Sequence, residues 1–75
     1  MNYGIKRIIK VKNFTKGRIM LVELFGKNMY AVLVFNDKND LIDSTCNMCF
    51  DDKNKKKILS MSRKTFKEKE ILLFN

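Results

Sequence analysis

Two apolar segments of similar length, residues 18–25 and 29–36, follow each other in the sequence with only Gly26-Lys27-Asn28 between them. A link this short, built from residue types that favour turns, requires a tight reversal of the chain. The two segments therefore predict an antiparallel β-hairpin at the centre of the fold.

A further strand is predicted before this hairpin, over residues 5–14. Apolar and basic side chains alternate there, as they do in a strand with one buried face. The apolar set is Ile5, Ile9 and Val11, and the basic set is Lys6, Lys10 and Lys12. Thr15-Lys16-Gly17 then predicts a turn in which Gly17 takes a positive φ.

After the hairpin, residues 37–40 predict a second turn, in which Asn39 is the best candidate for a left-handed residue. Residues 41–50 alternate again and predict a fourth strand. A charged loop over residues 51–57 and a fifth strand over residues 58–63 complete the expected sheet.

The end of the chain, residues 63–75, has two interpretations. In the first, Ser62 caps a short helix that becomes extended near its end, with Phe66 and Leu73 on one face. In the second, residues 71–74 form a sixth strand. The sequence pattern favours the helix only slightly.

Strands joined by such short links pair antiparallel with their neighbours in the sequence. The predicted fold is therefore mainly β, in a single domain of 75 residues. We expect a five-stranded antiparallel meander curled into a small barrel or half-barrel, with a short C-terminal helix or sixth strand.

Both strands of the central hairpin are apolar on both of their faces. An antiparallel sheet with one face in water alternates apolar and polar residues instead, so each face of this sheet needs a cover. The C-terminal segment supplies part of that cover. A homodimer or a protein partner is expected to supply the remainder, the alternative being that the C-terminal segment suffices.

The net charge of +8 is unevenly distributed along the chain. Residues 1–18 hold six bases and no acid (+6), residues 19–50 two bases and four acids (−2), and residues 51–75 eight bases and four acids (+4). Two basic regions around a near-neutral centre indicate a polyanion partner. The lysine excess also has two simpler origins, because AT-rich coding enriches lysine, and lysine on an edge strand prevents aggregation without binding anything.

The candidate nucleic-acid interface has a strand part and a loop part. A row of lysines on one strand face, followed by bases at the next turn, is able to track phosphates, and aromatic side chains at the ends of the row are able to stack on bases. The predicted contacts are Lys6, Lys10, Lys12, Lys16 and Arg18 from the strand part, Lys53, Lys55, Lys56 and Lys57 from the loop part, and Tyr3 and Phe14 as stacking residues.

Catalytic and metal chemistry have little support in the sequence. The chain has no histidine, so the usual activation of Ser or Cys nucleophiles is missing. Cys46 and Cys49 form a C-x-x-C, but zinc needs four ligands, and residues three apart on a strand point to opposite faces. Asp43, Asp51 and Asp52 only weakly resemble a nuclease carboxylate set. We therefore expect no enzyme activity, no metal and no cofactor.

The leading functional hypothesis is a small basic protein that binds RNA or DNA backbone with weak sequence preference and acts as a homodimer. The alternative is a phage- or mobile-element-encoded inhibitor or adaptor that acts on a host nucleoprotein, such as an anti-CRISPR protein or an RNA polymerase modulator. No apolar run approaches the length of a membrane span, and no secretory signal is evident, so a cytoplasmic location is expected.

Overall fold

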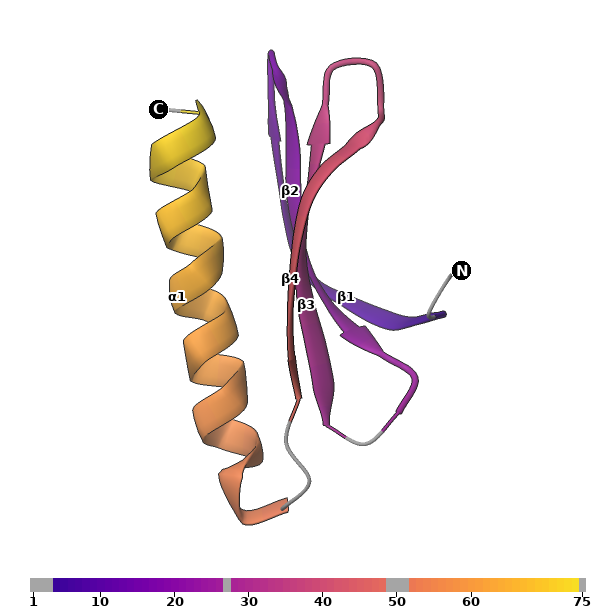
Figure 1. Cartoon of the computed structure of the whole chain (residues 1–75), viewed down its shortest axis with the longest axis vertical. Coiled ribbons are helices and arrows are strands. Elements are labelled where there is room, and N and C mark those ends of the chain that lie inside the picture. The colour runs from indigo at the N-terminus through magenta and orange to yellow at the C-terminus, as the bar shows by residue number, and fades with distance from the viewer. Residues whose placement is uncertain (1–3, 27, 49–51, 75) are drawn as a thin grey trace.

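The chain forms one antiparallel sheet with a long helix packed across one of its faces (Figure 1). The computed structural model describes residues 4–26, 28–48 and 52–74. The elements are β1 (Ile5–Phe14), β2 (Gly17–Leu24), β3 (Met29–Asn36), β4 (Leu41–Met48), a short 3-10 helix η1 (Asp52–Asn54) and α1 (Lys55–Phe74). The strands lie in the order β1-β2-β3-β4.

The mainly β class and the antiparallel meander are confirmed, but two details of the predicted fold are wrong. The described part of the chain has four strands rather than five, and the sheet does not close into a barrel. The two turn predictions hold: Gly17 has a φ of 152° and Asn39 a φ of 67°. The third strand has the predicted bounds, residues 29–36.

The predicted fifth strand is wrong because residues 58–63 are helical and belong to α1. Leu59, Ser62 and Phe66 recur every three or four residues, which is the period of a helix face. The helix begins at Lys55, inside the predicted loop, and continues to Phe74, so neither an extended end nor a sixth strand forms.

Ser62 does not cap a helix, because it lies in the middle of α1 and is buried. Its hydroxyl donates a hydrogen bond to the Ile58 carbonyl oxygen at 2.9 Å. The same hydroxyl oxygen accepts one from Asn47 Nδ2 at 3.3 Å. The serine thus links the helix to β4 where the two elements pack together.

The main core lies between α1 and the sheet. Its fully buried side chains come from β2, β3 and the helix: Ile19, Leu21, Val32, Val34 and Phe66. At one end of this layer the rings of Phe14 and Phe74 stack with centroids 4.8 Å apart. The stack joins the end of β1 to the end of α1.

Two irregularities in the pairing of β1 with β2 change which side chains share a face. They fall between Ile5 and Arg7 and between Ile8 and Lys10. Each adds a residue to β1, which interrupts the strict alternation of a strand. Ile9 therefore packs against the core under the helix, and the prediction that it shares a face with Ile5 and Val11 is wrong.

The sheet face opposite α1, which we call the outer face, is also apolar. Met20, Val22, Leu24 and Ala31 are buried in a second cluster there, beneath the partly buried Met29, Leu33 and Phe35. The helix covers the other face. The β3–β4 turn and the β2–β3 hairpin bend away from α1 at opposite ends of the sheet (Figure 1). The prediction that both faces of the hairpin are apolar is thus confirmed. Among the described residues, a helix covers one face, and no helix or second sheet covers the outer face.

Candidate functional site

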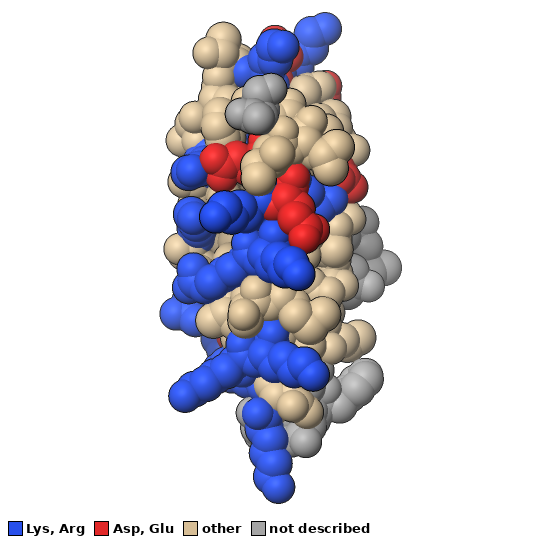
Figure 2. Space-filling model, turned by 90° about the vertical axis from the view of Figure 1, so that its left-hand side faces the viewer, with Lys and Arg blue, Asp and Glu red and all other residues tan. Residues whose placement is uncertain are grey.

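Basic side chains gather over the exposed side of α1. Figure 2 views the molecule from this side, with Lys and Arg spread along its length and carboxylates mostly in the upper half. At 3.6 residues per turn, Lys56, Arg63 and Lys67 fall in one row and Lys57 and Lys64 in the row beside it. We call these five residues the basic stripe.

The basic stripe is exposed along its whole length. From Lys56 to Lys67 the helix advances roughly 16 Å at 1.5 Å per residue, about the rise of five base pairs of a duplex. None of the five side chains makes an ion pair with a residue that the structure describes. The stripe therefore presents an array of five positive charges without an ion-pair partner among the described residues.

The lysines predicted to form a row on β1 have other contacts. Lys6 Nζ lies 3.8 Å from Glu23 Oε2, and Lys12 Nζ lies 2.8 Å from Glu70 Oε2. The ammonium group of Lys10 sits over the Phe66 ring, 5.0 Å from its centroid. The structure thus places Lys10 and Lys12 on the side of the sheet that carries α1, but holds them against the helix.

The remaining predicted contacts are scattered. Lys16 is exposed in the β1–β2 turn, whereas the Arg18 guanidinium stacks over the Phe35 ring at 4.4 Å on the outer face. Phe14 is committed to its stack with Phe74. Tyr3 lies outside the described residues.

The predicted basic loop is largely helical. Lys53 lies in η1, and Lys55, Lys56 and Lys57 form the first turn of α1. Sequence reasoning missed Arg63, Lys64 and Lys67, although their spacing from Lys56 and Lys57 is helical. The missing step was the start of the helix at Lys55, because a loop over residues 51–57 and a strand over residues 58–63 separate Lys56 and Lys57 from the predicted C-terminal helix.

Glu23 is the one acidic residue among the described ones that is buried, at 6% exposure. Its Oε1 accepts a hydrogen bond from Arg7 Nε at 2.7 Å. This hydrogen bond holds the pKa of Glu23 below its usual value, with help from the nearby charges of Lys6, Arg7 and Lys55 and against the effect of burial. The carboxylate therefore stays charged and ties β1 to β2.

A second carboxylate, Asp43 on β4, is paired with Lys69 of α1. The hydrogen bond from Lys69 lowers the pKa of Asp43. Together with the Lys12–Glu70 pair, this contact anchors α1 to both edge strands of the sheet. Asp43 and Glu70 are thus used in the packing of α1, whereas the exposed Glu68 is the helical acid that lies one turn from Lys64 of the stripe.

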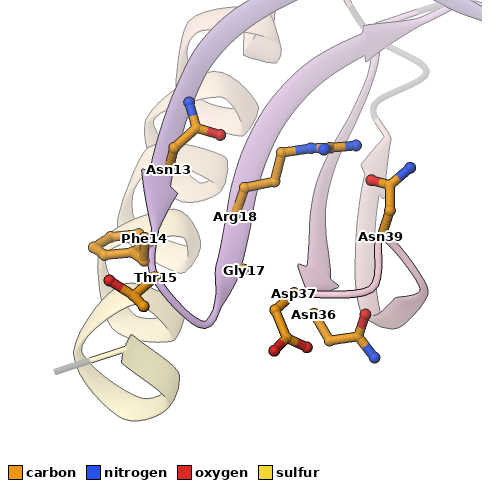
Figure 3. A pocket seen from close by; sticks show the side chains of 8 residues that line it. All are labelled: Asn13, Phe14, Thr15, Gly17, Arg18, Asn36, Asp37 and Asn39. Carbon is orange, nitrogen blue, oxygen red and sulfur yellow. The ribbon is translucent and has the colours of Figure 1, made fainter.

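An open pocket of about 250 Å³ lies between the β1–β2 and β3–β4 turns (Figure 3). Polar side chains from both turns line it, and the side chain of Arg18 extends toward Asn39. The Asn36 side-chain oxygen accepts hydrogen bonds from the backbone N–H groups of Lys38 and Asp40, so it serves the turn itself. Among the described residues, no hydrogen bond links the Thr15 hydroxyl of this lining to a base.

The described residues contain no group of three or more His, Cys, Asp or Glu side chains that could hold a metal ion. Cys46 is an exposed free thiol on β4, and its C-x-x-C partner Cys49 lies outside the described residues. Asp51, from the weak carboxylate set, also lies outside them. In the part of the chain that the structure describes, no helix is both long enough and apolar enough to cross a membrane.

Comparison with known proteins returned no match: no family model, no curated protein and no solved structure matches this chain.

Proposed function

We propose that this protein binds the sugar-phosphate backbone of RNA or DNA with weak sequence preference, through the basic stripe on α1. The observation that supports this most is the pairing state of the bases. The ion pairs of the described residues involve Lys6, Arg7, Lys12 and Lys69, and none involves the stripe.

The geometry of the stripe fits a backbone contact. Five Lys or Arg side chains on one straight helix project from one surface, and long flexible bases of this kind bind phosphates without reading base edges. The stripe is continuous with the flank of β1, where Lys10 and Lys12 lie beside the helix. Lys10 widens the positive field around the stripe, whereas the charge of Lys12 is compensated by Glu70.

Backbone binding of this kind depends strongly on salt. If about five phosphates are contacted, the logarithm of the association constant falls with a slope of about −4.5 against the logarithm of salt concentration. This slope corresponds to an affinity loss of about 500-fold between 50 and 200 mM salt. This slope applies to a duplex, and a single strand contacted through the same number of phosphates is expected to give a smaller slope of about −3.5.

The test measures binding of labelled RNA and DNA by fluorescence anisotropy over a range of salt concentrations. Two double variants each remove one Arg and one Lys: Arg63→Gln with Lys67→Gln in the stripe, and Arg18→Gln with Lys38→Gln on the far side of the sheet. Lys38 lies in the β3–β4 turn, which bends away from the helix (Figure 1).

The stripe variant is expected to bind at least about tenfold more weakly and to lower the magnitude of the slope by about 1.8, which corresponds to two lost contacts. The matched variant keeps the wild-type slope. Equal losses in both variants mean that only net charge matters, and the assignment of the stripe fails. If the wild-type protein does not bind at low salt, backbone binding is wrong and the nucleoprotein-inhibitor hypothesis becomes the leading one.

A further inference from the structure

The outer face presents exposed apolar side chains along both edges of the sheet. On the β1 side these are Ile5, Ile8 and Val11, and on the β4 side they are Leu41 and Met48. Between the two edges lies the second apolar cluster, with Leu33 and Phe35 partly open. Side chains this large, each about half open, amount to an apolar patch on the order of several hundred Å².

A face of this composition is typical of the inner layer of a larger assembly. A sheet that meets water on one face alternates polar and apolar residues, whereas β2 and β3 are apolar on both faces. Helix α1 is the second layer of the fold, and the described residues contain no third layer. A sheet of this kind is stable in water when another molecule supplies that layer.

The charges on the outer face indicate which kind of partner is able to bind there. Arg18 is the charged side chain that the strand pairing places on this face, and its guanidinium stacks on Phe35. The basic stripe lies on the exposed side of α1, and the helix packs on the opposite face of the sheet (Figure 2). Apart from Arg18, the strand pairing puts no charged side chain on the outer face among the described residues, so a nucleic acid finds a single base to bind there.

Two copies of a chain with a net charge of +8 repel each other unless their charges stay apart. Contact through the outer faces achieves this separation, because the two sheets and the two helices then lie between one basic stripe and the other. The patch is also self-complementary in chemistry, since its apolar side chains meet an identical apolar set about a two-fold axis, with Arg18 as the charged side chain beside them.

We propose that the outer face is the docking site for a second copy of this chain, giving a homodimer with two sheets inside and the two α1 helices outside. A stable interface buries about 800 Å² on each partner. The apolar patch supplies several hundred Å² of that area, and the remaining area has to come from the residues that surround it on the outer face. The proposed dimer goes beyond the proposed function and does not depend on it.

The first experiment measures the solution mass by sedimentation equilibrium over a wide range of protein concentrations. Two matched double variants carry the same chemical change on different surfaces. Ile8→Glu with Leu41→Glu alters the outer face, where these side chains are 54% and 55% exposed. Ile71→Glu with Leu72→Glu alters the end of α1, where the exposures are 56% and 80%.

The wild-type protein and the helix variant are expected to be dimers that dissociate on dilution, and the outer-face variant a monomer. All four substituted side chains are at least half exposed in a single copy, so each variant should keep the wild-type circular dichroism spectrum. Wild-type protein that remains monomeric up to about 1 mM overturns the proposal. Dissociation of both variants to the same extent overturns it as well.

A second measurement does not depend on the folding of those variants. Cys46 lies opposite Ala31 on the outer face, and its thiol is exposed in the single chain. In a Cys49→Ser background, the rate of Cys46 alkylation should fall as the protein concentration rises through the range in which the mass doubles. A rate that is independent of concentration through that range contradicts an outer-face interface, whatever the mass.

Discussion

Lys12 Nζ lies 2.8 Å from Glu70 Oε2, an ion pair that joins the edge strand β1 to the C-terminal half of α1. Fifty-eight positions separate the two residues in the sequence. The strand pattern predicts that Lys12 binds phosphate, but in the folded protein this lysine makes an ion pair with Glu70. Because the pair lies beside the basic stripe, breaking it should change the binding of RNA or DNA by the proposed interface.

The first prediction concerns the release of Lys12. Replacement of Glu70 by Gln frees the ammonium group beside the stripe, so the affinity for RNA or DNA should rise and the magnitude of the salt slope should increase by about 0.9. Glu68→Gln is the matched control, because Glu68 is exposed and makes no ion pair with a described residue. The measurement is the salt titration of binding. Equal effects of the two changes would show that Lys12 makes no phosphate contact when released.

The second prediction concerns the buried Glu23. Loss of its charge in Glu23→Gln weakens the contact with Arg7, so the free energy of unfolding at neutral pH should fall by about 1–3 kcal/mol. The folded-state pKa of Glu23 is lowered, so its contribution to stability is complete above the unfolded-state pKa and is lost as the pH falls through the folded-state pKa.

Urea denaturation at several pH values tests this linkage. The stability difference between the wild-type protein and Glu23→Gln should be largest near neutral pH and should shrink below about pH 4. A difference that stays constant from neutral to acidic pH would show that Glu23 contributes through its shape and not through its charge.

The third prediction concerns the hydroxyl group of Tyr30. The side chain is fully buried, and its oxygen has no hydrogen-bond partner among the described residues. An unpaired buried hydroxyl group costs folding free energy, so Tyr30→Phe should keep or raise stability, by up to about 2 kcal/mol. Thermal and urea denaturation measure this change. Ile19→Val in the neighbouring core should lose about 0.5–1.5 kcal/mol and shows that the assay resolves small changes. A clear loss of stability in Tyr30→Phe would reveal a bonded hydroxyl.

The fourth prediction concerns Gly17, whose φ of 152° is unfavourable for other residues. A Cβ atom at this position would lie 2.0 Å from the Phe35 carbonyl oxygen, a backbone atom that cannot move aside easily. Gly17→Ala should therefore destabilise the fold by about 2–4 kcal/mol in urea denaturation. In the control, Gly4→Ala, the new Cβ meets only the exposed Phe25 ring, which is free to rotate. Similar stabilities of the two variants would contradict this account of the β1–β2 turn.

Much of the sheet was predictable because its signals are local. The central hairpin follows from two apolar segments with a three-residue link, and β3 has the expected bounds. Gly17 and Asn39 take the positive φ angles that their turns require. The apolar character of both sheet faces was also visible in the sequence, and with it the expectation of an additional cover.

The last third of the chain was harder to predict because short apolar runs are compatible with either a strand or a helix. Residues 58–63 were assigned to a strand, yet they are part of a twenty-residue helix. The helix was recognisable only over a longer window, in which Leu59, Ser62 and Phe66 recur on one face. This difference moved Arg63, Lys64 and Lys67 into the candidate interface.

The local sequence pattern was sufficient for the strands, their turns and the excess of positive charge. The pairing state of each base depended on packing, because Lys12 meets Glu70 and Asp43 meets Lys69 only after α1 has docked on the sheet. The extra residues in β1 likewise depended on its pairing with β2. Contacts between residues far apart in the chain leave no periodic signal in the sequence. Only the tertiary structure therefore shows which lysines are in ion pairs and which are available to bind a partner.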